Sequence, residues 1–243
     1  MLTIVGWLWR DEVCRTQYTE GDVNLWAHMI HRNLTIPHRF IVLTDFPAPN
    51  FDRLIRGKRL WDDHREVRID GWRREFPQCW VRLKIFSKEM AEMLGERFVS
   101  IDLDCLVTGN LDAILAREED FLIYHRPILL SEDRNDPYQA SMFMMNAGCR
   151  SKVWEDFHGQ KSLEELAQLP GAKYFLKTDQ GWILYKLGRE EKGWSMEDGI
   201  YSWPWMQHKR IARPPENAKI IFFHGKNKAG DYDWINWIRE RYQ

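Results

Sequence analysis

The sequence predicts an α/β fold with a mixed, mostly parallel central sheet flanked by helices. Strand-forming residues fill positions 2–9 and 38–45, and residues 21–34 between them carry apolar side chains at helical spacing. A strand, a helix and a second strand within 45 residues are typical of a βαβ unit with parallel strands. Two later apolar runs, 98–101 and 218–225, also have the composition of buried strands. These observations together predict an α/β sheet.

The remaining elements follow from periodicity and from helix-ending residues. Gly95 ends a helical pattern over residues 79–94, and no repeat, low-complexity tract or Gly/Ser linker divides the chain. We therefore expect a single domain over residues 1–243. Residues 51–75 lack a clean period and are expected to form irregular surface. The other expected elements are strands at 120–125 and 140–148, helices at 151–157, 162–169 and 178–188, and a final helix in the Trp-rich tail.

Composition makes some broad classes of protein less favoured without excluding them. The 243 residues include 35 basic and 36 acidic side chains, so the chain lacks the strong positive charge of a protein that binds nucleic acid mainly through phosphates. The four cysteines form no C-x-x-C pair, which favours a reducing, cytoplasmic setting. We expect no signal peptide and no transmembrane segment. The 13 tryptophans can cover core edges or line a cleft that binds sugars or bases.

Two aspartates, Asp102 and Asp104, follow the strand "FVSI" directly. The spacing is weak evidence, since chance gives about one such pair in this chain, and a second pair, Asp231 and Asp233, lies in a polar stretch that can simply cap a helix. The position is better evidence, because ligands of open parallel sheets bind at the carboxyl ends of strands. Residues i and i+2 of an extended chain point the same way, so both carboxylates can face one Mg²⁺ or Mn²⁺ ion.

A second candidate is "FFHGKNK", where His224 ends another apolar run. Gly225 allows a sharp turn or a close approach of the backbone to a ligand, and Lys226 and Lys228 add positive charge. A histidine with two carboxylates suits Mn²⁺ better than Mg²⁺. Taken alone, a histidine such as His224 is more often a hydrogen-bonded structural residue, and such lysines more often belong to a solvated turn. The pairing with the two aspartates is what favours a metal site.

Five short motifs occur in the order seen in one enzyme family. They are "WVRLKIFS", "SIDLDCLV", "NAG" at 146–148, "TDQGW" at 178–182 and "FFHGKNK". In this order they resemble the GT-A-fold glycosyltransferases of family 8, which include glycogenin and bacterial lipopolysaccharide galactosyltransferases. The resemblance spans almost the whole chain, and five ordered motifs are far more specific than any one of them. It implies a GT-A, Rossmann-like fold.

The resemblance also implies roles for individual residues. A divalent metal that bridges the donor's phosphates is assigned to Asp102, Asp104 and His224. Roles in donor binding fall on Arg82 and Asn146 near the donor sugar, on Lys228 at the diphosphate, and on Tyr18 as a ring stacked on the nucleobase. The pair Asp179 and Gln180 is assigned to the reacting carbon. The chain departs from the family where Ala229 and Gly230 replace a proline and a tryptophan, and where the first strand reads "GWLW".

The expected activity is transfer of a hexose from a nucleotide-diphosphate sugar, with UDP as the expected nucleotide and the anomeric configuration retained. The metal, Lys228 and Arg82 would stabilise the charge on the leaving diphosphate. Asp179 or Gln180 would stabilise the oxocarbenium-like carbon. Alternatives from other classes are a sugar nucleotidyltransferase or metal phosphohydrolase, and a carbohydrate-binding module that uses its tryptophans.

The sequence leaves the acceptor open. A glycan or a lipid-linked sugar is favoured, and hydroxymethylated DNA is an alternative. Residues 51–84 carry ten basic and six acidic side chains, with Trp61, Trp72 and Trp80 among them. This segment could contact the acceptor, or it could be a solvated face with ordinary salt bridges.

Overall fold

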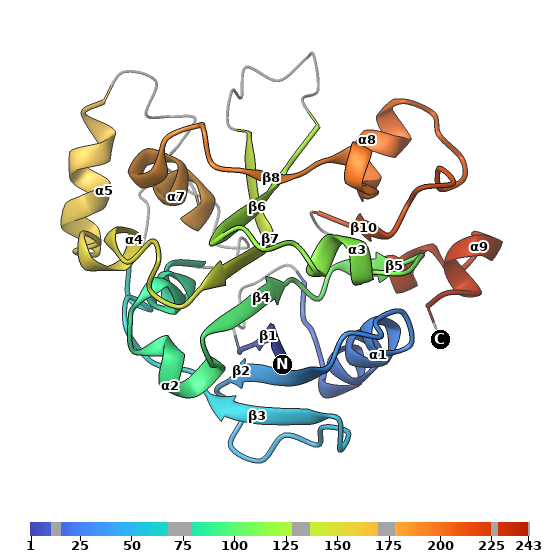
Figure 1. The fold of residues 1–243 in the computed structure, drawn as a ribbon, viewed down its shortest axis with the longest axis horizontal. Coiled ribbons are helices and arrows are strands. Elements are labelled where there is room, and N and C mark those ends of the chain that lie inside the picture. The colour runs from blue at the N-terminus through green and yellow to red at the C-terminus, as the bar shows by residue number, and fades with distance from the viewer. Residues whose placement is uncertain (11–15, 68–78, 128–136, 170–177, 225–227, 243) are drawn as a thin grey trace.

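The computed structural model describes residues 1–10, 16–67, 79–127, 137–169, 178–224 and 228–242. Its central feature is a seven-stranded sheet with the strand order β3-β2-β1-β4-β7-β6-β8 (Figure 1). Four of the six strand pairings are parallel, and the two that involve β7 with β4 and β6 are antiparallel. The sheet strands are β1 (Leu2–Leu8), β2 (His38–Thr44), β3 (Ile55–Arg59), β4 (Arg97–Ile101), β6 (Phe121–His125), β7 (Tyr138–Asn146) and β8 (Gly193–Trp194).

A smaller sheet has the order β5-β10-β9 and lies beside helix α1. Its strand β10 runs antiparallel to β5 and parallel to β9. The small sheet brings the segment after β4 next to a segment from the end of the chain. Its strands are β5 (Cys105–Val107), β9 (Ile200–Ser202) and β10 (Ile220–Phe222).

Helices cover both faces of the large sheet. The longest is α1 (Glu20–His31), which begins with a capping box in which Thr19 and Asp22 bond each other's backbone N–H. The other α-helices are α2 (Met90–Leu94), α3 (Asp112–Leu115), α4 (Lys152–Glu155), α5 (Gln160–Ala167), α7 (Asp179–Leu187), α8 (Trp203–His208) and α9 (Asn236–Arg239). The 3-10 helices are η1 (Cys79–Phe86), η2 (Met196–Asp198) and η3 (Ala229–Tyr232).

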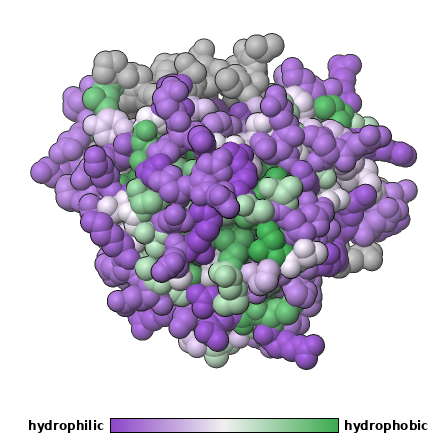
Figure 2. Space-filling model, in the orientation of Figure 1, coloured by the Kyte–Doolittle hydropathy of each residue, from purple (hydrophilic) through white to green (hydrophobic). Residues whose placement is uncertain are grey.

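Two hydrophobic cores lie on the two faces of the sheet, because side chains alternate along each strand. On β1, Ile4 and Leu8 pack with α1 and the small sheet, whereas Val5 and Trp7 pack with η1, α2 and α7. The outer surface is largely hydrophilic on the face shown in Figure 2, with smaller apolar areas near its middle. Within the described residues, no helix is long and apolar enough to cross a membrane.

The structure confirms the fold class and corrects two expected elements. The expected single helix over 79–94 is a 3-10 helix, η1, followed by the separate α2. Nearly every η1 side chain is buried, so the segment is fixed by packing on all sides and not by one apolar helical face. The expected irregular region 51–75 contains the edge strand β3, whose last four residues are exposed and therefore show no alternating apolar pattern.

Candidate active site

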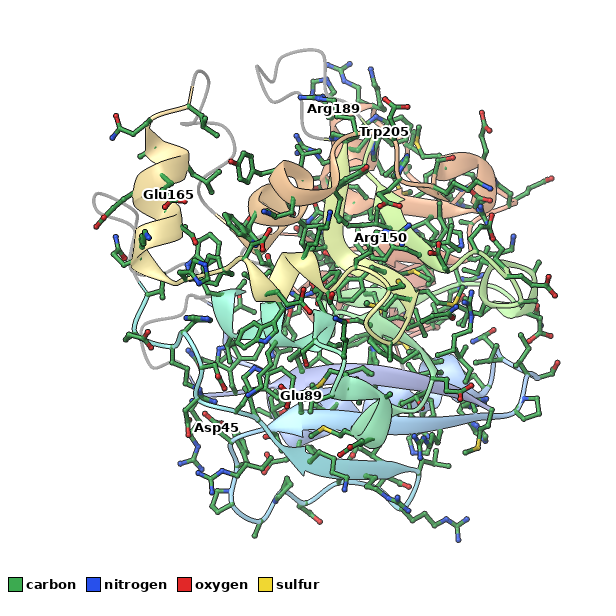
Figure 3. The ribbon with its side chains drawn as sticks, turned by 60° about the vertical axis from the view of Figure 1, so that its left-hand side comes forward. Asp45, Glu89, Arg150, Glu165, Arg189 and Trp205 are labelled. Atoms are coloured by element: carbon green, nitrogen blue, oxygen red, sulfur yellow. The ribbon has the colours of Figure 1, made fainter. Side chains whose placement is uncertain are left out.

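The carboxyl ends of β1, β2 and β4 meet at one edge of the sheet, because these strands are parallel. Asp45 follows β2 at this edge and is labelled in Figure 3. Asp102 follows β4, and its backbone N–H donates to the carbonyl of Ser141 on β7 at 2.8 Å. The sheet thus delivers the first aspartate of the D-x-D pair to the edge at which α/β sheets bind ligands.

The small sheet joins the two candidate motifs in space. The register pairs Cys105 with Phe222, and the backbone N–H of Phe223 donates to the carbonyl of Asp104 at 2.6 Å. His224, the next residue, therefore lies beside the D-x-D segment although the two are far apart in the chain. The small sheet therefore places the two motifs side by side.

Arg82 is the centre of the polar contacts at this edge. Its Nη1 lies 3.0 Å from Asp102 Oδ1, its Nε lies 3.4 Å from Asp179 Oδ2, and its Nη2 donates to the carbonyl of Ala140 at 2.6 Å. The guanidinium also lies 5.5 Å from the ring centroid of Trp7. Burial lowers the pKa of Arg82, but Asp102 and Asp179 more than offset this, so its pKa is raised overall. Arg82 is a buried, permanently charged cation that joins two acids.

Asp179 opens helix α7 and is 4% exposed. Burial raises its pKa, and the neighbouring Arg82 charge opposes that rise. The backbone N–H of Gln180 donates to Asp179 Oδ1 at 3.0 Å, which keeps the carboxylate at the first turn of the helix. The sequence-predicted pair of Asp179 and Gln180 therefore lies in the same cluster as Arg82 and Asp102.

His224 sits in an aromatic setting with one polar side. Its ring stacks with Phe222 and Tyr124, and its Nδ1 lies 3.4 Å from both Ser141 Oγ and Gln139 Nε2. Burial lowers the pKa of His224 to about 4, so the imidazole is neutral at pH 7. Its Nε2 is buried and makes no hydrogen bond with any described residue. A neutral imidazole has a lone pair on one of its ring nitrogens. An Nε2 atom that makes no hydrogen bond with the described residues fits a metal ligand.

The described residues contain no group of three or more His, Cys, Asp or Glu side chains arranged closely enough to hold a metal ion. The three predicted metal ligands therefore lie in one region of the fold, but their side chains are not arranged closely enough to hold a metal ion. They are Asp102, Asp104 and His224. Asp102 is instead held by Arg82. The donor set and the unbonded Nε2 of His224 fit a divalent cation, and the metal site remains a prediction.

Tyr18 and Lys228 lie together on the α1 side of this edge. Lys228 Nζ is 4.5 Å from the ring centroid of Tyr18 and 2.9 Å from Asp22 Oδ2. Burial raises the pKa of Tyr18, and the charges of Asp104 and Asp102 raise it further. The structure thus brings these two predicted donor-binding residues next to each other and next to the D-x-D pair.

One predicted donor-binding residue, Asn146, does not join the cluster. Asn146 ends β7 and pairs with Arg97 at the start of β4, four residues and roughly 13 Å of strand from Ile101. Its side-chain oxygen accepts from Arg97 Nη1 at 2.7 Å. The antiparallel direction of β7 therefore places the "NAG" sequence at the opposite edge, away from the other predicted donor contacts. Gly225 lies outside the described residues.

The second D-x-D pair has the structural role that its polar surroundings indicate. Asp231 Oδ2 accepts from the backbone N–H of Lys228 at 2.8 Å and caps the 3-10 helix η3. Asp233 is exposed at the end of that helix. The pair therefore belongs to a helix cap, as its polar surroundings in the sequence indicate.

Sequence reasoning missed two polar side chains of the cluster. Gln139 and Ser141 lie two residues apart near the start of β7 and both approach His224. The carbonyl of Ala140 between them accepts from Arg82. The available signal was a pair of polar residues with period 2 inside an otherwise apolar strand, which places both on one face.

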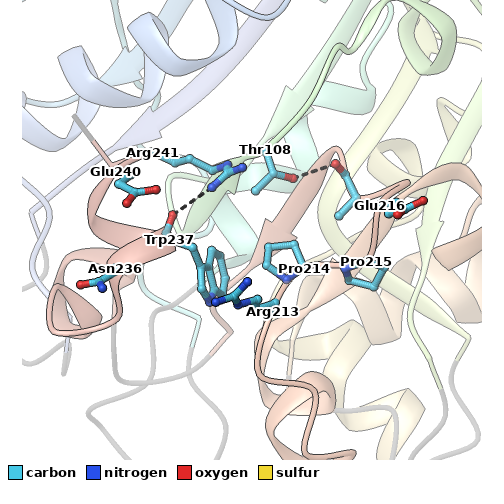
Figure 4. Close-up of a pocket in the computed structure, with 10 residues that line it drawn as sticks. Thr108, Arg213, Pro214, Pro215, Glu216, Asn236, Trp237, Glu240 and Arg241 are labelled. Carbon is cyan, nitrogen blue, oxygen red and sulfur yellow. Dashed lines mark hydrogen bonds between the residues drawn. The ribbon is translucent and has the colours of Figure 1, made fainter.

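Two hollows lie outside this cluster. One, of about 570 Å³, is at the carboxyl ends of β2 and β3 and includes Asp45, Lys58 and Arg59. The other, of about 510 Å³, lies at the Thr108 end of the small sheet and includes Trp237, with Thr108 donating to the carbonyl of Ala218 (Figure 4). Neither lining includes the residues around Arg82. The basic segment beside the first hollow has ion pairs such as Lys84 with Asp63 and Arg65 with Asp45, as a solvated face does.

Comparison with known proteins supports the fold. No model of a protein family matches the sequence, and no curated protein matches it. Among solved structures, the galactosyltransferase LgtC in complex with donor and acceptor sugar analogs is similar, with a TM-score of 0.61, 14% identity, and coverage of 99% of this chain and 93% of the other. An active-site mutant of LgtC gives a TM-score of 0.62 with the same identity and coverage.

A third similar structure is the glycosyltransferase GlyE of Streptococcus pneumoniae TIGR4. It gives a TM-score of 0.55 and 12% identity, and the match covers 94% of this chain and 56% of the other. At these identities the likeness concerns the fold. The predicted GT-A-type α/β architecture is thereby confirmed over nearly the full length of the chain.

Proposed function

We propose that this chain is a metal-dependent glycosyltransferase that moves a hexose from a nucleotide-diphosphate sugar, expected to be a UDP-sugar, to a hydroxyl acceptor with retention of configuration. One observation carries the proposal: the contacts of Arg82 with Asp102 and Asp179 lie at the strand edge to which the small sheet brings Asp104 and His224. The shared fold with two named glycosyltransferases supports it.

The chemistry of this class needs positive charge at the leaving group. As the bond between the sugar carbon and the diphosphate oxygen breaks, negative charge develops on the diphosphate. Lys228, which lies over the Tyr18 ring, and Arg82, which is paired with Asp102, are cations of this region that can approach it. A bound Mn²⁺ or Mg²⁺, held by Asp102, Asp104 and His224, would add Lewis-acid stabilisation of that charge.

Asp179 suits the role of an electrostatic stabiliser near the reacting carbon. Its carboxylate is buried and paired with Arg82. The pairing fixes the position of the carboxylate and makes it less available as a nucleophile. A fixed negative charge in a site that excludes water stabilises a developing oxocarbenium ion. We assign the neighbouring Gln180 to a polar contact with the substrate at the same helix end.

The acceptor is proposed to be a glycan or a lipid-linked sugar. Hydroxymethylated DNA is the other acceptor that the donor chemistry allows, and no described contact favours it. Incubating the protein and the best donor with each acceptor class separates them. A labelled sugar that appears only in the DNA fraction would overturn the glycan assignment.

The experiment that tests the proposal measures nucleoside diphosphate released from a panel of nucleotide sugars in the presence of Mn²⁺. Asp104→Ala is expected to reduce release by at least about 100-fold, the scale expected when a main electrostatic contributor is lost. Asp233→Ala is the matched control, because it alters the other D-x-D pair, which caps a helix. Full activity of Asp104→Ala in the presence of a chelator would refute the metal-dependent mechanism.

Product stereochemistry tests retention separately. With an α-linked donor, the first product formed should show the α-anomeric proton coupling by NMR. A β-linked product would refute the assignment as a retaining enzyme while leaving the transferase activity intact.

A further inference from the structure

The carboxylate of Asp22 accepts hydrogen bonds both from the start of its own helix and from a segment about 200 residues later in the chain. Its Oδ2 accepts from Thr19 N at 2.8 Å, from Thr19 Oγ1 at 2.9 Å and from Lys228 Nζ at 2.9 Å. The Tyr242 hydroxyl is near this carboxylate: burial raises the pKa of Tyr242, and the charge of Asp22 and a hydrogen bond with it raise that pKa further. In its capping-box role Asp22 needs only the Thr19 contacts, so the contacts with Lys228 and Tyr242 call for a separate explanation.

Backbone hydrogen bonds hold the segment that carries Tyr242 in place beside Asp22. The backbone N–H of Tyr242 donates to the carbonyl of Ile238, which is fully buried, and Arg32 Nη2 donates to the carbonyl of Arg241 at 2.5 Å. A Cβ atom at Gly230 would lie 2.8 Å from the Tyr242 ring. Glycine at position 230 therefore leaves room for the Tyr242 ring, and this position is one of those at which the chain departs from the family it resembles.

The ammonium of Lys228 is consequently fixed in place. It lies over the Tyr18 ring and is bonded to Asp22, with only 20% of its side chain and 18% of that of Asp22 exposed. A free lysine loses much rotamer freedom when it binds an anion, and a lysine that is already held loses less. An ammonium has three protons, so the bond to Asp22 leaves capacity for an incoming phosphate oxygen.

We propose that Asp22 and Tyr242 are positioning residues of the donor subsite, which hold Lys228 in place for the diphosphate of a nucleoside diphosphate. This inference rests on the proposed function. The negative charge of Asp22 does not cancel the benefit, because that carboxylate already accepts from Thr19 N, Thr19 Oγ1 and Lys228 Nζ and lies at the N-terminus of α1, where the helix dipole favours an anion. Asp22 and Tyr242 act through Lys228 and need not contact the substrate.

The test is calorimetric binding of UDP and of UMP in the presence of Mn²⁺. Asp22→Asn is expected to weaken UDP binding about tenfold and UMP binding less than twofold, because the fixed ammonium serves the second phosphate. Tyr242→Phe, which removes one donor to Asp22, is expected to weaken UDP binding about threefold. In a Lys228→Met background, Asp22→Asn should have no further effect, since the two residues act as a unit.

Matched controls remove similar groups elsewhere. Asp52→Asn removes a carboxylate whose Oδ2 lies 3.2 Å from Nε2 of His28 on helix α1, and Tyr201→Phe removes a tyrosine hydroxyl bonded to Asn217. Both controls should bind UDP as the unaltered protein does. Two results would show a merely structural role for Asp22 and overturn the proposal. One is that Asp22→Asn weakens UDP and UMP binding equally. The other is that Asp22→Asn weakens UDP binding as much in the Lys228→Met background as it does in the unaltered protein.

Tighter UDP binding by Asp22→Asn would also overturn it, because Asp22 would then compete with the diphosphate for Lys228. A second route does not alter Asp22: Gly230→Ala should displace the Tyr242 ring and weaken UDP binding by about threefold or more, and Tyr242→Ala should abolish that further effect. Unchanged UDP binding by Gly230→Ala would contradict the proposal. If the unaltered protein binds none of UDP, GDP and ADP, the proposed function itself fails, which is distinct from failure of this inference.

Discussion

Replacing Arg82 by methionine should strongly destabilise the fold as well as abolish turnover. The Arg82 side chain is 7% exposed and the Asp179 side chain is 5% exposed, with 3.4 Å between Nε and Oδ2. Removing one partner of a buried ion pair leaves the other charge uncompensated and costs about 3–5 kcal/mol. Asp102 contributes less to this cost, because 22% of its side chain is exposed and water can solvate it.

The measurement is urea unfolding followed by tryptophan fluorescence at pH 7, compared with thermal unfolding. A loss of about 3–5 kcal/mol corresponds to a fall of roughly 6–20 °C in Tm for a domain of this size. Arg82→Met combined with Asp179→Asn should recover about half of the lost free energy or more, since the double variant buries no unpaired charge. Both variants should lack activity, so stability and not turnover decides the outcome.

The pH dependence supplies a further check with a definite sign. Burial raises the pKa of Asp179 in the folded protein, and removing Arg82 removes the interaction that opposes this rise. A carboxyl whose folded pKa is raised destabilises the fold at pH values above that pKa, and this penalty disappears as the pH falls through it. The stability deficit of Arg82→Met should therefore shrink on acidification. A loss below about 1 kcal/mol at pH 7, or a double variant no more stable than the single one, would refute the ion-pair reasoning.

Three other predictions concern strand packing, acid stability and metal binding. Gly193→Ala should cost at least about 2 kcal/mol in urea unfolding, because its Cβ would lie 2.0 Å from the carbonyl oxygen of Ile123 on the adjacent strand, and a cost within 0.5 kcal/mol would contradict this. The pKa of Asp112 is lowered to about 2, chiefly by hydrogen bonds from Thr35, so its stabilising effect is present above pH 4 and is lost as the pH falls towards 2. In Asp112→Asn, the free energy of unfolding should accordingly fall less steeply between pH 4 and pH 2 than in the unaltered protein. An equally steep fall in both proteins would argue against this role of Asp112. Mn²⁺ with UDP should raise the Tm of the unaltered protein but not of His224→Ala, and an equal rise in both would remove His224 from the proposed metal site.

Much of the fold could be predicted from the sequence where apolar patterning is strong. The strand at 38–45 and the helix at 21–34 were expected within a few residues of β2 and α1, because their buried faces give clear periods. Strand β3 was missed because an exposed basic edge strand lacks that signal. The expected helix at 79–94 divides into η1 and α2 because tertiary packing overrides helical periodicity there.

The site was predictable to the extent that it lies at strand ends. Asp102 and Asp179 were named from short motifs, and the structure brings both to Arg82. The "NAG" motif was misleading because a short motif carries no information on strand direction, and the antiparallel β7 takes Asn146 to the far edge. The contact of Asp22 with Lys228 joins residues 206 positions apart, and no local pattern encodes it.

The central claim is that the protein breaks the bond between the sugar carbon and the diphosphate oxygen of a nucleotide sugar. Phosphorus NMR tests it most directly, on a reaction run with Mn²⁺ and stopped by excess chelator. The account predicts the paired signals of a nucleoside diphosphate, absent when Asp104 is replaced by alanine. Signals of a nucleoside monophosphate and a sugar 1-phosphate would mean that the bond between the two phosphates is broken instead, and would contradict the account.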